Sequence, residues 1–243
     1  MGTAFLNKTV GEFVRENPLR ARIFDKYGID YCCGGKKTIA QASAQAGVQP
    51  EALEELLMAA PSPGSEDNAI SAMGLTELAR HIVLSHHDYL RREIPRIQHM
   101  FSRVINAHGK TAPEFRSASR IFDEFAAEIG HHMMKEERIL FPAIERIDSS
   151  VTPPCFPFGT LANPIRMMEA EHDDAGNALE QIRVLLNGYS PPNWACNTVR
   201  ALYAALEELE QDMHQHVHKE NNVLFPNAIQ KENDLGRADA QTA

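Results

Sequence analysis

The chain has 243 residues, 43% of them hydrophobic and 23% charged, which is the composition of a folded globular protein and excludes wholesale disorder. At roughly 150 residues per domain, this length allows one large or two modest domains. The net charge of −9 argues against binding to nucleic acid or to a membrane surface, because both attract a basic face. Eleven histidines are more than such an acidic protein needs for solubility.

Cellular context follows from what the chain lacks. No apolar run approaches the roughly 18 residues that a membrane span needs, and residues 1–10 contain no apolar signal segment. Four cysteines in this length do not form a disulfide scaffold. We therefore expect a soluble cytoplasmic protein that binds neither nucleic acid nor membrane.

A linker divides the chain. Residues 61–74 begin with the sequence PSPGSEDN, which is typical of a linker. They separate a small domain at 1–60 from a larger one at 75–230, and residues 231–243 are expected to form a flexible tail.

Short helices are predicted in the small domain by their end signals. Asn17 before Pro18 is typical of a helix start, and Gly28 of a helix end. In the same way, a second helix should follow Thr38 and end at Gly47. A third is expected from Pro50 to Ala59.

Four long helices are predicted in the larger domain by apolar stripes at helical spacing. Their expected ranges are 75–107 with a kink at Pro95, 113–140 ended by Pro142, 164–186, and a fourth from near Ser190 to just before Pro226. Antiparallel packing is favoured by the short connections. The predicted fold is therefore all-α, a small N-terminal helical domain followed by an up-down-up-down four-helix bundle.

One motif occurs twice in the larger domain. Residues 132–142 read HMMKEERILFP and residues 216–226 read HVHKENNVLFP, 84 positions apart. His87 recurs as His172 after 85 positions, each time followed by Asp. The bundle is therefore two copies of one unit, a single His on one helix and His-x-x-x-Glu on the next.

This spacing predicts a metal site. Residues i and i+4 share one helix face, so each His-x-x-x-Glu pair can hold one object, and the motifs lie at similar depth in antiparallel helices. Duplication argues against the alternative that these are core or surface residues recurring with the helical period. The side chains expected to converge inside the bundle are His87, His132, Glu136, His172, His216 and Glu220.

Buried carboxylates and imidazoles together indicate a cation, and this mixture suits iron, manganese or zinc. If Glu136 and Glu220 bridge two ions, the six side chains fill about eight of roughly twelve coordination positions. The remaining positions are open to water or a small ligand. We therefore expect a site that reacts or exchanges its metal.

The repeated ligand set resembles the haemerythrin-like bundle. Together with the segment DYCCGGK at 30–36, the chain resembles the RIC (repair of iron centres) family over nearly its whole length. The resemblance implies two non-haem iron ions per chain, held by the six residues above, with both Glu bridging and an oxo or hydroxo bridge. Oxygen-carrying haemerythrins place a further His where this chain has Gly176, which weakens an oxygen-carrier interpretation and fits a more open centre.

Family resemblance also implies a function. It is the repair of iron–sulfur clusters damaged by nitric-oxide or oxidative stress, with damaged iron–sulfur proteins as clients and nitric oxide or dioxygen as small ligands. A nitric-oxide reductase-type catalyst and an oxygen or nitric-oxide sensor remain as alternatives, so whether the chain is an enzyme stays open. A structural zinc bundle is disfavoured by the open coordination. A homodimer is expected because the N-terminal domain needs a partner surface for its apolar residues.

Two acidic residues near the ligands are candidates for the reaction. Glu128 precedes His132 by four positions, and Glu171 adjoins His172. Each is expected to hydrogen-bond a ligand or to line a path for iron or protons. The alternative is a solvated helix charge.

The cysteine pair is a further candidate. Cys32 and Cys33 lie in a glycine turn, where we expect them to be exposed and suited to thiol exchange, nitrosylation or transient metal handling. A structural pair is the alternative. Of the remaining residues, Cys196 is expected to be incidental, and His214 and His218, which flank His216, are expected at the surface.

Overall fold

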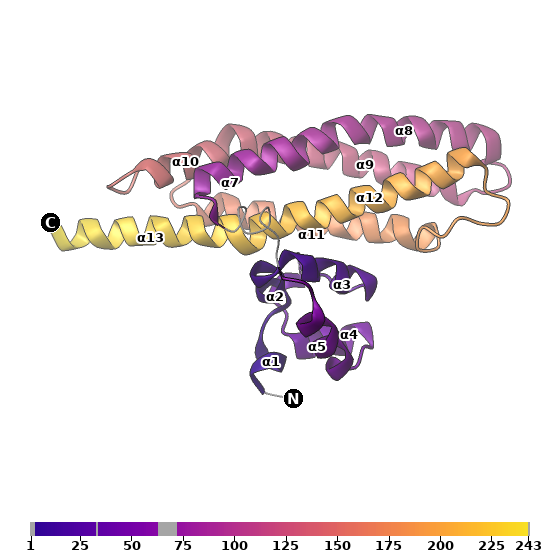
Figure 1. Ribbon diagram of the computed structural model, residues 1–243. Helices are drawn as coiled ribbons and strands as arrows, with labels where there is room; N and C mark the ends of the chain where they lie inside the picture. Colours follow the sequence, from indigo (N-terminus) through magenta and orange to yellow (C-terminus); the bar gives the residue numbers. More distant parts are fainter. Residues whose placement is uncertain (1–2, 33, 63–71, 243) are drawn as a thin grey trace. The chain divides into compact units, whose positions relative to one another are not determined.

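The computed structural model describes residues 3–32, 34–62 and 72–242 (Figure 1). Within these ranges the chain is helical and contains isolated β-bridges but no β-strand, which confirms the all-α prediction. None of the helices in those ranges is both long and apolar enough to cross a lipid bilayer. The chain forms two compact units, the first from Met1–Arg80, Ala143–Ile165 and His214–Ala243, the second from His81–Pro142 and Arg166–Met213.

The second unit is a four-helix bundle. It contains α8 (Asp88–His108), α9 (Glu114–Lys135) and most of α11 (Ala162–Leu185) and α12 (Asn197–Lys219). Polar contacts join successive helices and close the ring: Gln98 to Asp123 at 2.8 Å, His132 to Glu171 at 2.9 Å, Arg183 to Glu210 at 3.1 Å, and His86 to Asp212 at 2.9 Å.

An aromatic core fills this bundle. Phe122 of α9 is completely buried, and its ring centroid lies 5.6 Å from that of Phe101 and 5.7 Å from that of Phe125. Residues 115, 118, 122, 125 and 129 of α9 are all buried, which is the stripe that helical periodicity predicts. The core therefore follows from the sequence pattern.

Wide π-turns interrupt the long helices at positions that we did not predict. They are η3 (Val83–His87) between α7 (Leu75–Ile82) and α8, η4 (Glu136–Leu140) between α9 and α10 (Phe141–Ser149), and η5 (Glu220–Leu224) between α12 and α13 (Phe225–Thr242). The expectation that Pro142 and Pro226 end their helices was therefore wrong. Each proline is the second residue of a new α-helix, where a missing N–H costs least. Pro95 lies inside α8, and the π-turn that interrupts this long helix lies earlier, at η3.

The expected C-terminal tail is helical. Residues 231–242 continue α13, and within this stretch Leu235 is buried. The side chain of Gln230 donates to Asp234 at 2.8 Å, one turn along. Such i,i+4 pairs stabilise the exposed face of a helix, so the polar composition of this stretch does not prevent it from being helical.

In the first unit, the small domain contains α1 (Thr3–Asn7), α2 (Val10–Glu16), α3 (Ala21–Lys26), α4 (Ile39–Ala46) and α5 (Pro50–Ala59), with short 3-10 turns η1 (Pro18–Arg20) and η2 (Gly34–Lys36). The predicted end signals are confirmed. Thr38 accepts a hydrogen bond from the Gln41 amide, and Gly28 and Gly47 have φ of +62° and +66°. Helices α1 and α2 were not predicted, although Thr9 forms a capping box with Glu12 at the start of α2.

Candidate metal centre

The π-turns position three of the predicted ligands. His87 is the last residue of η3, while Glu136 and Glu220 are the first residues of η4 and η5. π-turns within α-helices are frequent at functional sites, because the extra residue redirects the neighbouring side chains. All six predicted ligands are buried, none with more than 2% of its surface exposed.

In the second unit, Glu136 lies between two histidines. Its Oε2 is 3.3 Å from Nε2 of His87, and its Oε1 is 3.3 Å from Nε2 of His132. The two oxygens of one carboxylate therefore face different imidazoles. On the other side of His132, Nε2 of His172 is 3.0 Å from its Nε2.

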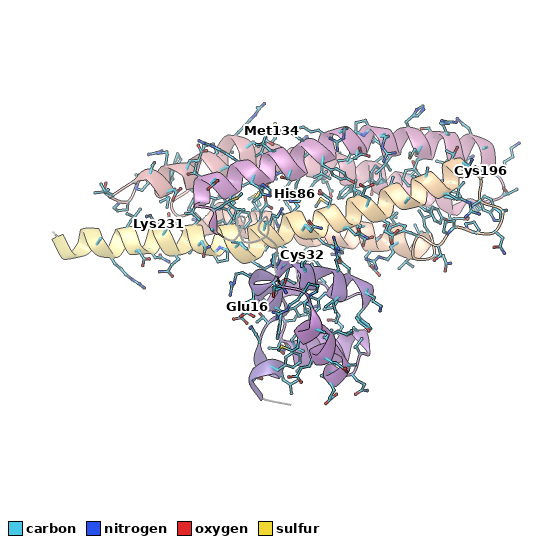
Figure 2. The ribbon with its side chains drawn as sticks, in the orientation of Figure 1. Glu16, Cys32, His86, Met134, Cys196 and Lys231 are labelled. Atoms are coloured by element: carbon cyan, nitrogen blue, oxygen red, sulfur yellow. The ribbon has the colours of Figure 1, made fainter. Side chains whose placement is uncertain are left out.

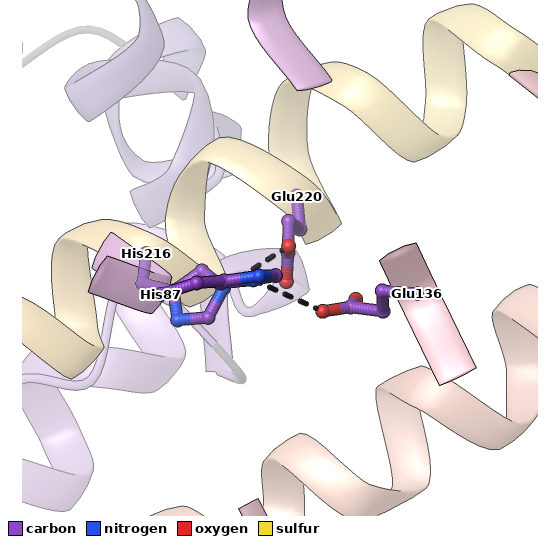
Figure 3. Close-up of side chains that lie close together, drawn as sticks. All are labelled: His87, Glu136, His216 and Glu220. Carbon is purple, nitrogen blue, oxygen red and sulfur yellow. Dashed lines mark hydrogen bonds and ion pairs between the residues drawn. The ribbon is translucent and has the colours of Figure 1, made fainter. Parts of the chain in front are cut away.

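In the first unit, the second His-x-x-x-Glu pair is also formed. Nε2 of His216 lies 3.1 Å from Oε1 of Glu220, one helical turn away. Figure 3 shows this pair and the pair of His87 with Glu136, each joined by a dashed line.

The ligand atoms form two groups of four. Within each group these atoms lie within 4.8 Å of one another, and the groups are His87, Glu136, His216, Glu220 and His132, Glu136, His172, Glu220. Glu136 and Glu220 belong to both groups. Buried imidazole nitrogens and carboxylate oxygens this close together suit a cation, and iron, manganese and zinc accept this donor set. The residues therefore fit bound metal.

Outer hydrogen bonds orient two of the histidines. Nδ1 of His87 lies 2.6 Å from Oε1 of Glu137, which also accepts from Arg91 at 2.5 Å. Pairing of Nδ1 with a carboxylate fixes the tautomer that leaves Nε2 to face a metal. Neither partner was predicted, although the Glu-Glu sequence at 136–137 in the first copy of the motif offered a signal.

Glu171 has the same role toward His132. Its Oε2 lies 2.9 Å from Nδ1 of His132, and its other oxygen accepts from Lys135. The hydrogen bond with His132, followed by that with Lys135, lowers the pKa of Glu171 to about 2. Lys135 was also not predicted, although its recurrence as Lys219 in the repeat was visible.

Comparison with known proteins adds an independent observation. Residues 78–228 match the family model described as "Hemerythrin HHE cation binding domain", and residues 6–61 match the "Domain of Unknown function (DUF542)". The chain is 37% identical over 227 residues to "Iron-sulfur cluster repair protein YtfE" of Enterobacter sp. (strain 638), covering 93% of this chain and 98% of that one. The proteins of the same name from Citrobacter koseri and Escherichia coli O17:K52:H18 are 36% identical, with the same coverage. The chain belongs to the YtfE family.

In this YtfE-family chain, the two acidic candidates line one pocket of about 230 Å³. Glu128 is exposed, whereas Glu171 is half-buried and contacts a predicted ligand. The pocket also presents His131, Lys135 and Asp174, and its wall combines these polar groups with the apolar side chains of Phe125, Ile129 and Ala175. The structure thus brings Glu128 and Glu171 to the same cavity, with Glu171 the nearer to the ligands.

The cysteine pair differs from expectation. Cys32 has only 5% of its surface exposed, so the prediction that it is exposed was wrong, and Cys33 lies outside the described residues. The Cys32 thiol donates to Oδ1 of Asp30 at 3.1 Å, and the Asn222 side chain donates to the Cys32 carbonyl at 3.2 Å. Burial follows from packing of this turn against η5, a contact between segments far apart in sequence.

The same packing covers His218. The ring centroid of His218 lies 5.7 Å from that of Tyr31, and burial lowers the pKa of His218 to about 4. The expected surface position of His218 was therefore wrong. His214, which is half-buried, pairs with Asp25 at 3.0 Å.

Proposed function

We propose that this protein repairs iron–sulfur clusters damaged by nitric-oxide or oxidative stress, using an open di-iron centre held by the six buried ligands. The observation that carries the proposal is the pair of four-residue groups that share Glu136 and Glu220. Near full-length similarity to proteins named for iron–sulfur cluster repair supports it.

Several features support two iron ions rather than one structural ion. The shared carboxylates favour bridging, and the ligand set leaves coordination positions open. Bound iron would supply both an exchangeable metal and a place where nitric oxide or dioxygen can bind. The protein's own contribution is to hold Nε2 of His87 and His132 toward the centre through Glu137 and Glu171.

The pocket beside His132 supports a path for iron or protons. Glu128 at its exposed wall can attract a cation, and Glu171 can pass it toward the ligands or hold a proton. Lys135 neutralises Glu171, so a cation that reaches Glu171 competes with an ammonium group. We propose that Glu128 acts on the rate of exchange and Glu171 on both rate and affinity.

We further propose that Cys32 and Cys33 handle thiol or iron–nitrosyl transfer with the client. Because Cys32 is buried against η5, this role requires the turn that carries it to open first. Clients are damaged iron–sulfur proteins, the small ligands are nitric oxide or dioxygen, and the setting is the cytoplasm. A homodimer stays a prediction.

A double substitution tests the proposal. Glu136→Leu with Glu220→Leu should abolish iron loading together with the recovery of a [4Fe–4S] enzyme that nitric oxide has damaged. The matched control replaces two exposed carboxylates of α9 and α12, the helices that lead into these turns, Glu124→Leu with Glu207→Leu, and should retain both properties. Repair by the iron-free double variant would show that the mechanism is wrong.

A further inference from the structure

Asn222 links the Cys32 turn to a predicted metal ligand. It lies in η5, two residues after Glu220, and its side-chain amide donates to the carbonyls of Tyr31 at 3.4 Å and of Cys32 at 3.2 Å. Its own carbonyl accepts from Arg15 at 3.4 Å. Both the backbone and the side chain of this residue are therefore held by the small domain.

Two glycines create the space for the Asn222 amide. A Cβ at Gly11 would lie 2.4 Å from Oδ1 of Asn222, and a Cβ at Gly35 would lie 2.7 Å from it. Real side chains essentially never approach so closely, so a larger residue at either position would displace the amide. Neither glycine has positive φ, so close approach and not backbone conformation requires them.

The first copy of the repeat makes no such contact with the part of the chain that the structure describes. The position equivalent to Asn222 is Arg138 in η4, which is exposed, and Met134, one turn earlier, is 40% exposed (Figure 2). The two copies thus carry the same ligand motif in different surroundings. In the second copy the π-turn that begins at Glu220 is held by the small domain, whereas in the first copy the corresponding surface faces solvent.

We infer that Asn222 is a positioning residue through which the docked Cys32 turn fixes η5 and keeps Glu220 directed into the metal site. Release of the turn then exposes the Cys32 thiol and loosens Glu220 in a single event, while Glu136 keeps its position. The inference rests on the proposed function for its role in repair. Its physical content, coupling between the turn and η5, is independent of iron.

Two substitutions of Asn222 separate shape from hydrogen bonding. Asn222→Asp keeps the size of the side chain but removes the donor, and Asn222→Ala removes both. Gly35→Ala perturbs the same contact from the small domain. The matched control is Arg138→Ala, which removes a side chain from the equivalent position of η4.

The first readouts use the metal-free full chain. Deuterium uptake by the amides of residues 220–224 and alkylation of Cys32, distinguished from the adjacent Cys33 by fragmentation of the peptide, should both rise roughly tenfold in the Asn222 variants, the scale of losing two hydrogen bonds. Arg138→Ala should leave both unchanged. A rise in Cys32 alkylation without faster exchange in η5 would overturn the coupling.

The second readout is titration with Co²⁺, followed by its absorption spectrum. The Asn222 variants should bind Co²⁺ more weakly and with an altered spectrum, whereas Arg138→Ala should match the unsubstituted protein. Equal weakening in Arg138→Ala would overturn the specific role of Asn222. If no variant and not even the unsubstituted protein bound metal, the proposed function would fail, while deuterium exchange would still decide the coupling.

Discussion

Replacing Glu171 by glutamine tests how strongly the outer hydrogen bonds support the metal ligands. Glutamine keeps an oxygen that can accept from Nδ1 of His132, 2.9 Å away, but removes the negative charge. Loss of an outer partner typically lowers metal affinity by roughly 10- to 100-fold. A charge-assisted hydrogen bond is about twice as strong as a neutral one. Glu171→Gln, which keeps a neutral hydrogen bond, should therefore lower metal affinity by close to 10-fold, and Glu171→Ala, which keeps none, by close to 100-fold.

The charge of Lys135 should also lower metal affinity in Glu171→Gln. Lys135 donates to Glu171, which neutralises its ammonium group. Without the carboxylate, that positive charge stays beside the site and disfavours a bound cation. We therefore expect about a tenfold loss for Glu171→Gln, equivalent to about 1.4 kcal/mol.

The assay is competition between the protein and ferrozine for Fe²⁺ without oxygen, with Glu124→Gln on the exposed face of α9 as the control. The control should match the unsubstituted protein within twofold. An unchanged affinity in Glu171→Gln and Glu171→Ala would refute the argument that this carboxylate orients His132. An equal loss in the control would show a general electrostatic effect instead.

Three further predictions concern other parts of the molecule. Glu128→Gln should slow iron uptake severalfold without changing iron affinity, because Glu128 lines the pocket but is exposed. Stopped-flow mixing with Fe²⁺ measures the uptake rate, and an unchanged rate or a changed affinity would contradict this prediction. Phe122→Ala should lower the free energy of unfolding by about 3–5 kcal/mol through a core cavity while preserving iron stoichiometry, and a loss below 1 kcal/mol in urea denaturation would contradict the packing. Hydrogen bonds from the backbone amide of Val199 and from the side chain of His108 lower the pKa of Cys196 to about 7, so alkylation of Cys196 should increase as pH rises through 7. At pH 7 it should exceed that of exposed Cys155, and equal rates would contradict the shift.

The candidate ligand set stands out in the sequence because its pattern is local and repeated. Within each His-x-x-x-Glu motif the helix alone brings the two side chains together, and His216 and Glu220 indeed lie 3.1 Å apart. Duplication then predicted the partners on the other helices. The ligand set remains an expectation about metal binding, but the burial and proximity of its members agree with it.

The π-turns could not be predicted from the same pattern. Proline rules concern one residue and its own helix, and they predicted that Pro142 and Pro226 end helices. Whether the turn before a proline widens depends on how the neighbouring helices pack around it, which hydrophobic periodicity does not record. The widened turns begin at the two motif carboxylates, Glu136 and Glu220, so the local rule failed at the predicted metal site.

Burial of Cys32 and His218 was missed for a different reason. Asn222 and Cys32 are 190 positions apart, and nothing local to either segment indicates their contact. The glycines at 11 and 35 were visible, but their purpose is a close approach to Asn222 that only the folded chain reveals. Contacts between segments so distant in sequence determine which residues of an amphipathic helix are covered.

Iron content per chain, measured with the electronic spectrum on protein purified without oxygen and then exposed to nitric oxide, tests the account most directly. The account predicts two iron ions per chain and absorption bands that change when nitric oxide is added. Tightly held zinc, or no metal after reconstitution with iron, would contradict the proposed di-iron centre and leave the repeated motif as a structural duplication.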